Sequence, residues 1–333
     1  MNAPQPIQMK QSVEPDKRYS REELGIPAQG DPKASPADQP PSTESEITID
    51  AISDEHPLWL SVSEAKMDGY GGVILSGPPG TGKSWYAQKI AARLAGSPDR
   101  IRSVQFHTGY QYEDFVQGWE PDGAGGFVRA NRHLLTIAQA AKEDQENSYV
   151  LVIDEISRAD VPRVLGEALT YLEMSLRDRP FYLASGEITE IPANLFIIAT
   201  MNPWDISVDE LDIALERRFA HIEVLPNAEE LLGILDSNGA DVETKELCRA
   251  LFGLLQGSSN SMIHVGHAYF SRVKDEASLD RLWKFQIWPH IKRVTRLDPP
   301  EATRIETAWK ARKANRPAAP GPADEVGSNK ESE

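Results

Sequence analysis

The sequence predicts an α/β fold in which a mostly parallel sheet flanked by helices is followed by a small all-helical lid domain. Helix-like segments alternate with apolar runs of strand length, a pattern typical of parallel sheets. After Pro226 the apolar spacing becomes helical, as in 228–235 and 244–255, with almost no convincing strand. The strand-like runs are 72–76, 104–107, 149–154, 195–201 and 220–225.

The 333 residues, of which 40% are hydrophobic, are enough for one substantial core and a smaller second domain. Both ends are rich in Pro, Ser and charged residues with few large apolar side chains, so they cannot offset the entropy of ordering. We expect a disordered leader (1–47), an α/β core (48–225), a helical lid domain (226–314) and a disordered tail (315–333).

The charge, the cysteine content and the hydropathy restrict the possible functions. A formal net charge of −16 disfavours a direct nucleic-acid site, because gripping phosphates needs clustered Lys and Arg. The single cysteine, Cys248, excludes an internal disulfide, and its apolar surroundings indicate a buried position. No apolar run approaches the roughly 18 residues of a membrane span, and the first residues lack a signal-peptide core. We therefore expect a cytoplasmic protein with no membrane contact.

The strongest motif lies between the strand-like run 72–76 and the helix-like segment 83–94. It fits G-x-x-x-x-G-K-[ST] in the structural context that a phosphate-binding loop requires. Glycines let backbone N–H groups point at phosphates, Lys83 offsets charge on the β and γ groups, and Ser84 ligates Mg²⁺. The predicted nucleotide-binding residues are Gly77, Pro78, Pro79, Gly80, Thr81, Gly82, Lys83 and Ser84.

Two further strand-like runs end in polar residues. The run 149–154 ends in Asp154, followed by Glu155, so one carboxylate can hold hydrated Mg²⁺ while the other polarises the attacking water. The run 195–201 is followed by Asn202, which either contacts the γ-phosphate or water, or belongs to an Asn-Pro turn.

A predicted short helix, 209–216, is followed by Arg217 and Arg218. Two explanations remain open. Cations are favoured at the carboxyl end of a helix by its dipole. Alternatively, one guanidinium reaches the triphosphate of a neighbouring subunit and stabilises the transition state.

Together these motifs resemble the AAA+ superfamily, in its dynein-related and MoxR-like branch, and are similar to the McrB family of modified-cytosine restriction NTPases. The similarity runs from about residue 60 to 297. It also includes the weaker blocks 104–107, 112–118, 153–159 and 266–270. The resemblance implies Lys83 and Ser84 as Walker A, Asp154 and Glu155 as Walker B, Asn202 as sensor 1 with Asp205 in its loop, and Arg217 or Arg218 as the arginine finger. It also implies Mg²⁺ and a homo-oligomeric ring, a hexamer.

The chain departs from this family at two places. The family's sensor loop usually reads Met-Asn-Thr-Ala-Asp-Arg, whereas residues 201–206 read Met-Asn-Pro-Trp-Asp-Ile, which leaves partner-stimulated turnover of the family's kind open. Restriction members carry an N-terminal DNA-reading domain where this sequence has the acidic segment 1–47, so we expect a stand-alone motor. ATP is favoured by frequency in the superfamily, and GTP, which McrB prefers, stays possible. His264 and His267 have no third metal ligand nearby, so packing or a lid role is favoured.

Three functions share these residues. The first is a ring NTPase that remodels a protein or drives a nuclease partner of the McrC kind. The second is a MoxR-like chaperone that matures another enzyme. The third is a nucleotide-gated scaffold with negligible turnover. Glu155 favours an enzyme, because a pure switch does not need a water-activating carboxylate.

Overall fold

The structure is a computed structural model that describes residues 51–123, 125–203, 215 and 217–314. The predicted leader (1–47), the predicted tail (315–333), Asp205 and all of the predicted helix 209–216 except Leu215 lie outside these residues.

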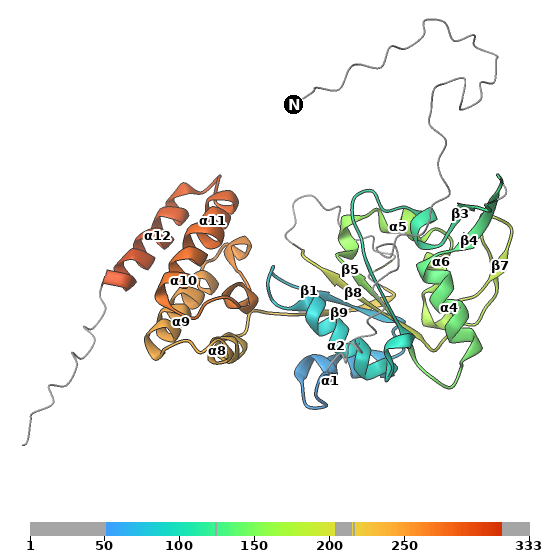
Figure 1. The fold of residues 1–333 in the computed structure, drawn as a ribbon, viewed down its shortest axis with the longest axis horizontal. Coiled ribbons are helices and arrows are strands. Elements are labelled where there is room, and N and C mark those ends of the chain that lie inside the picture. Colours follow the sequence, from blue (N-terminus) through green and yellow to red (C-terminus); the bar gives the residue numbers. More distant parts are fainter. Residues whose placement is uncertain (1–50, 124, 204–214, 216, 315–333) are drawn as a thin grey trace, which may run out of the picture. The chain divides into compact units, whose positions relative to one another are not determined.

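The core is a five-stranded parallel sheet in the order β2-β5-β8-β1-β9 (Figure 1). The predicted α/β class is therefore confirmed. The two outer strands differ from the predicted runs in their bounds. The edge strand β2 begins at Ile101, earlier than predicted. Only Val104 on it is buried, so no apolar run marks its start. The strands are β1 (Gly72–Ser76), β2 (Ile101–Gln105), β5 (Tyr149–Asp154), β8 (Leu195–Met201) and β9 (Phe219–Glu223).

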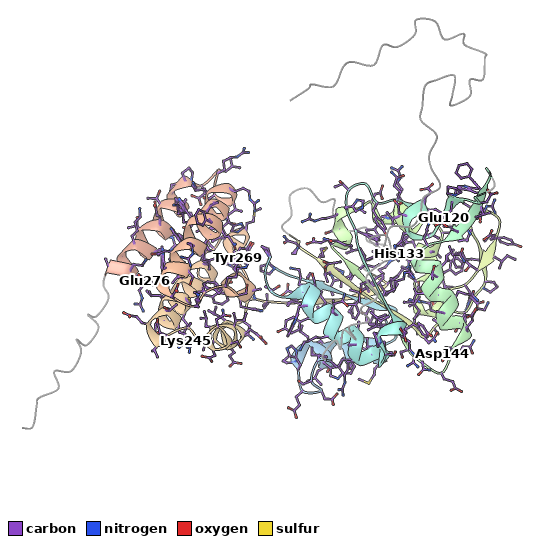
Figure 2. The ribbon with its side chains drawn as sticks, viewed as in Figure 1. Glu120, His133, Asp144, Lys245, Tyr269 and Glu276 are labelled. Carbon is purple, nitrogen blue, oxygen red and sulfur yellow. The ribbon has the colours of Figure 1, made fainter. Side chains whose placement is uncertain are left out.

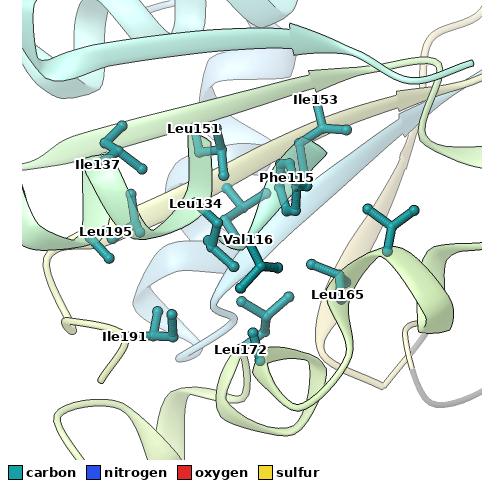
Figure 3. Packing of buried hydrophobic residues seen from close by; sticks show 14 of the residues in the cluster. Phe115, Val116, Leu134, Ile137, Leu151, Ile153, Leu165, Leu172, Ile191 and Leu195 are labelled. Atoms are coloured by element: carbon teal, nitrogen blue, oxygen red, sulfur yellow. The ribbon is translucent and has the colours of Figure 1, made fainter. Parts of the chain in front are cut away.

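Helices cover both faces of the sheet because successive side chains of the central strands point to opposite faces. On one face, Val73 and Leu75 of β1 pack in one cluster with Ile90 of α2 and Val62 of α1. On the other face, Ile74 belongs to a second cluster that includes Phe115, Leu134 and Leu151 (Figure 3). The helices of the core are α1 (Pro57–Met67), α2 (Lys83–Ala95), α3 (Tyr112–Phe115), α4 (His133–Glu143), α5 (Val161–Leu165) and α6 (Ala168–Tyr171).

Two small antiparallel hairpins, absent from the predicted elements, lie outside the main sheet. They are β3 (Gln117–Pro121) with β4 (Phe127–Asn131), and β6 (Phe181–Tyr182) with β7 (Ile188–Thr189). Most side chains of β4 are exposed, so the strand lacks the apolar pattern that marks a buried one.

After β9 the described chain is helical, as its apolar spacing predicts. Asn227, Asp241 and Asp275 each cap a helix by accepting backbone N–H groups. These helices have an apolar cluster of their own, in which Cys248 is fully buried, and burial raises the pKa of its thiol to about 12. The helices are α8 (Ala228–Ser237), α9 (Val242–Gln256), α10 (Glu276–Leu282), a π-helix (Trp283–Ile287), α11 (Trp288–Val294) and α12 (Pro299–Ala314). Among the described residues, no helix is long and apolar enough to cross a membrane.

Candidate nucleotide site

The glycine-rich loop leaves the end of β1 and leads directly into α2, as predicted. Gly80 and Gly82 have φ angles of +79° and +80°, in the left-handed region that only glycine adopts readily. A Cβ on Gly80 would lie 2.5 Å from the ring of Tyr269. Both the backbone conformation and the available space therefore require glycine at position 80.

Lys83 holds its ammonium group against the loop itself. Its Nζ donates to the carbonyl oxygens of Gly77 at 2.9 Å and Pro78 at 2.8 Å. Burial lowers the pKa of Lys83, and the negative charges of Glu155 and Asp154 partly oppose this. The positive charge lies close to where phosphates would bind the loop, and its hydrogen-bond partners among the described residues are these two neutral carbonyl groups.

The structure brings Ser84 and Asp154 together, although 70 positions separate them in the sequence. The Ser84 hydroxyl donates to Oδ1 of Asp154 at 2.6 Å. The parallel register explains their proximity, because β1 and β5 both flank β8 and end at the same edge of the sheet. Hydroxyl and carboxylate oxygens are the ligands that Mg²⁺ prefers, so this pair fits the predicted metal site.

Thr200, near the end of β8, is a site residue that the sequence motifs do not indicate. Its hydroxyl donates to Oδ1 of Asp154 and accepts the backbone N–H of Glu155 at 3.1 Å. Thr200 is only 1% exposed. A hydroxyl in an otherwise apolar strand was the available signal, because a buried hydroxyl needs a partner.

Glu155 follows β5 with φ 56° and ψ 45°, a left-handed conformation that is costly for a residue with a Cβ. Nε of Arg158 donates to its Oε2 at 3.3 Å. Backbone strain of this kind persists where the surroundings enforce it, often at functional sites. The Glu155 carboxylate therefore accepts from Arg158, whereas the neighbouring Asp154 carboxylate accepts from Ser84.

The remaining predicted residues fall at two edges of the sheet. Asn202 directly follows β8, at the same edge as the glycine-rich loop. Arg217 and Arg218 directly precede β9, whose Phe219 pairs with Gly72 at the start of β1. Four steps of about 3.3 Å along β1 lead from Gly72 to Ser76 at the strand's end, so the two arginines begin ~13 Å from the loop's edge. The structure does not bring them to their own chain's site.

The segment 266–270 joins the helical part of the chain to the glycine-rich loop. The backbone N–H of Gly266 donates to the Pro79 carbonyl at 2.8 Å, and that of Ala268 to the Gly80 carbonyl at 2.9 Å. Tyr269, labelled in Figure 2, belongs to the same segment. His267 is buried, and its Nδ1 accepts the Asn227 backbone N–H at 3.4 Å, a packing contact.

Trp85 lies immediately after Ser84 on α2 and is 54% exposed. The ammonium of Lys89 lies 4.3 Å from the centre of its indole ring. A large exposed aromatic side chain therefore follows Ser84 on α2.

Comparison with known proteins identifies the domain in which this arrangement lies. Residues 72–219 match the model of the AAA domain, dynein-related subfamily, a range that begins with β1 and ends at the first residue of β9. The chain carries an AAA domain. That domain includes the glycine-rich loop, Asp154, Glu155, Thr200 and Asn202.

The chain is related to two subunits of restriction systems. It is 36% identical over 233 residues to the type IV methyl-directed restriction enzyme EcoKMcrB subunit of Escherichia coli K12, covering 65% of this chain and 50% of that protein. It is 27% identical over 188 residues to the type II restriction enzyme BsuMI component YdiS of Bacillus subtilis 168, covering 44% of this chain and 55% of that protein. The chain thus spans about half the length of these curated relatives.

Among solved structures, a putative ATPase from Cytophaga hutchinsonii is similar with a TM-score of 0.36 and 13% identity, over 59% of this chain and 64% of that one.

Proposed function

We propose that this protein binds and hydrolyses a purine nucleoside triphosphate with Mg²⁺, ATP being favoured and GTP possible, as one subunit of a homo-oligomeric ring. The observation that carries this proposal is the 2.6 Å contact between Ser84 and Asp154. It unites the end of the glycine-rich loop with the acidic end of β5, beside Lys83 and Glu155. A switch that binds a magnesium–nucleotide complex would share this pair, and the adjacent Glu155, which can polarise water, favours hydrolysis.

Each residue has a distinct task in the proposed reaction. The backbone N–H groups of the loop and the start of α2 bind the phosphates, and Lys83 offsets their charge. Ser84 and Asp154 would hold Mg²⁺, which supplies charge neutralisation at the β and γ groups when bound. Glu155 orients and polarises the attacking water, and Asn202 contacts that water or the γ-phosphate.

Thr200 fixes the positions of Asp154 and Glu155 relative to each other. One hydroxyl contacts both the Asp154 carboxylate and the Glu155 backbone, so the two acidic residues keep a fixed relation to β8. We therefore assign Thr200 as a positioning residue.

The arginines favour action between subunits. Since Arg217 and Arg218 lie at the edge of the sheet away from their own loop, they can serve a triphosphate only on another copy. An arginine finger contributes on the order of 10³–10⁵ in rate.

We expect such a ring to act on a partner protein. Both named relatives are described as parts of restriction enzymes, which favours a nuclease partner of the McrC kind over a MoxR-like maturation client. The described residues include no cluster of three or more metal-ligating side chains that would itself supply a metal-dependent nuclease centre.

Two substitutions test the enzymatic assignment. Lys83→Ala removes the charge that offsets the phosphates and should abolish nucleotide binding. Glu155→Gln keeps the shape of the site and should retain binding while stopping hydrolysis. Binding is measured with a fluorescent ATP analogue, and turnover by phosphate release. Near wild-type turnover in Glu155→Gln would refute the role of Glu155, and a wild-type protein that binds but never hydrolyses would favour the scaffold.

Mixing two inactive variants tests action between subunits. The double variant Arg217→Ala, Arg218→Ala keeps its loop, whereas Lys83→Ala keeps its arginines. A mixed interface combines an intact loop with an intact arginine pair, so hydrolysis should partly return. A mixture that co-assembles but stays inactive would show that the arginines do not act across the interface.

A further inference from the structure

The amino end of α2 has no side-chain cap of its own. Its N-cap residue, Gly82, has no side chain that could accept the first backbone N–H groups of the helix. These N–H groups have no partner within an α-helix, and the helix dipole favours an anion beside them. The start of α2 is therefore open to the phosphates of the proposed nucleotide.

The segment 266–270 brings one histidine to this end of α2. The backbone N–H groups of both neighbours of His267, Gly266 and Ala268, donate to carbonyl oxygens of the glycine-rich loop, at 2.8 and 2.9 Å. The main chain of His267 is thus fixed against the loop from both sides. Its Nε2 lies 3.7 Å from the position that a Cβ on Gly82 would take. The imidazole ring is therefore held next to the N-cap of α2.

The surroundings of the ring determine which of its nitrogens carries the proton. Nδ1 of His267 accepts the backbone N–H of Asn227 at 3.4 Å, so Nδ1 is unprotonated. Burial lowers the pKa of His267, and the charge of Glu230 partly opposes this, so the neutral ring is favoured. A neutral imidazole with an unprotonated Nδ1 carries its proton on Nε2. The nitrogen that faces Gly82 is therefore a hydrogen-bond donor.

This donor lacks an acceptor although the side chain is buried. His267 is 5% exposed, and its Nε2 makes no hydrogen bond with any residue that the structure describes. A buried donor without an acceptor is unfavourable, and most such groups in proteins are paired. An acceptor supplied by a bound ligand would satisfy Nε2.

We propose that Nε2 of His267 donates a hydrogen bond to an oxygen of the α- or β-phosphate of the nucleotide bound at the amino end of α2. The inference rests on the proposed function, but only on nucleotide binding and not on hydrolysis. A phosphate matches the whole site, because the helix N–H groups and the imidazole N–H are all donors and phosphate oxygens are acceptors. A metal ion does not match it, because a protonated nitrogen cannot be a ligand.

The contact gives the helical part of the chain a direct share in nucleotide binding. Asn227, which donates to His267, is also the N-cap residue of α8. Glu230 of the same helix hydrogen-bonds Tyr86 of α2, whose ring lies 3.3 Å from a Cβ built on Gly82. The phosphates, the glycine-rich loop and the start of α8 therefore meet around one imidazole ring.

Two substitutions of His267 separate a hydrogen bond from packing. His267→Phe keeps a ring but removes the donor, whereas His267→Gln places an amide N–H close to the position of Nε2. His267→Phe should raise the dissociation constant for ADP by about 10-fold, as expected for one hydrogen bond to a charged group, and His267→Gln should restore most of the affinity. Packing alone predicts the opposite order, because phenylalanine fills a buried site and glutamine does so poorly.

The measurement is competition of nucleoside diphosphates, which the protein does not consume, against the fluorescent ATP analogue in the presence of Mg²⁺. ADP, GDP and 2′-deoxyADP differ in base or ribose but share both phosphates, so His267→Phe should weaken all of them by the same factor. The matched control is His264→Phe, because Nε2 of His264 contacts the carbonyl oxygen of Ser258 and not the loop. This control should leave affinity unchanged.

Urea unfolding verifies that each variant is folded. If His267→Phe does not fold, His267→Asn replaces it, because its shorter amide does not reach the position of Nε2. The inference is wrong if a folded variant without the donor binds ADP like the wild type, or if His267→Gln restores nothing. A factor that differs between ADP and 2′-deoxyADP or GDP would assign the contact to the ribose or base and also overturn it. Failure of the proposed function looks different, because the wild type itself would then bind none of the nucleotides.

Discussion

Gly266 forms the contact between the helical part of the chain and the glycine-rich loop, and Gly266→Ala should loosen it. A Cβ there would lie 2.0 Å from the Gly80 carbonyl oxygen and 2.2 Å from the Thr81 nitrogen. Ordinary contact begins at 3.4 Å, and both obstructing atoms belong to the main chain. The two segments must therefore separate by about 1 Å, since packed interiors have no spare room.

The cost follows from the contacts that such a separation breaks. The Gly266–Pro79 and Ala268–Gly80 hydrogen bonds, at 2.8 and 2.9 Å, would be lost or weakened. At about 0.5–1.5 kcal/mol each, the free energy of unfolding should fall by ~1–3 kcal/mol. Because the loop that binds the phosphates is itself displaced, we expect nucleotide affinity to fall by about 10-fold, the equivalent of about one hydrogen bond.

Titration with a fluorescent ATP analogue and urea unfolding provide the two measurements. Gly253→Ala, in α9 where nothing lies within 4 Å of a new Cβ, is the matched control. It should leave affinity unchanged and stabilise the protein by up to ~1 kcal/mol, because alanine is the better helix former. If Gly266→Ala binds nucleotide and unfolds like the wild type, the reasoning is wrong.

Three further substitutions have defined outcomes. Arg177 is 5% exposed and donates to four main-chain carbonyl groups, so Arg177→Ala should lower the free energy of unfolding by ~3–5 kcal/mol in urea, and a loss below ~1 kcal/mol would contradict this role. Thr200→Val keeps the shape but removes the hydroxyl that holds Asp154, so phosphate release should slow at least ~10-fold while nucleotide affinity changes little; unchanged turnover would rule out positioning. Hydrogen bonds from Arg304 and Ser258 lower the pKa of Glu301 to about 2. Its contribution to stability is therefore present above pH 4.5 and lost as the pH falls towards 2, and acid unfolding of Glu301→Gln should lack this pH-dependent component.

The main elements of the fold could be predicted because their sequence signals are local. The central strands β1, β5 and β8 are almost wholly buried, so each reads as a continuous apolar run. The edge strand β2 has only one buried residue, and most residues of the hairpin strand β4 are exposed, so both lack this signal. The bounds of β2 depend on its pairing with β5 and those of β4 on its pairing with β3, which periodicity does not reveal.

Some residues of the candidate site could likewise be predicted from local sequence motifs, and others could not. The spacing of the loop residues predicted Lys83 and Ser84, and the end of an apolar strand predicted Asp154. Thr200 was not predicted, because its role depends on a contact with Asp154, which lies 46 positions away in the sequence. The hydrogen bond from Gly266 to Pro79 was not predicted either, because it joins main-chain atoms, which are alike in every residue.

For Arg217 and Arg218, the pairing of β9 with β1 gives information that their sequence motif does not contain. Their sequence allowed either a helix cap or an arginine finger. The pairing of Phe219 with Gly72 places them at the far edge of the sheet and removes any role on their own chain's phosphates. That conclusion required the order and direction of the strands.

The exposed indole of Trp85 gives this protein a built-in optical probe. It directly follows the proposed metal-ligating serine, and its ring faces the cation of Lys89. Tryptophan emission responds to the polarity and charge around the ring, so arrival of a metal–nucleotide complex should alter its intensity. The chain contains seven tryptophans, and the change lost in Trp85→Phe isolates the contribution of this one. Loading of the site could then be followed in stopped flow with unmodified nucleotide and without an attached dye.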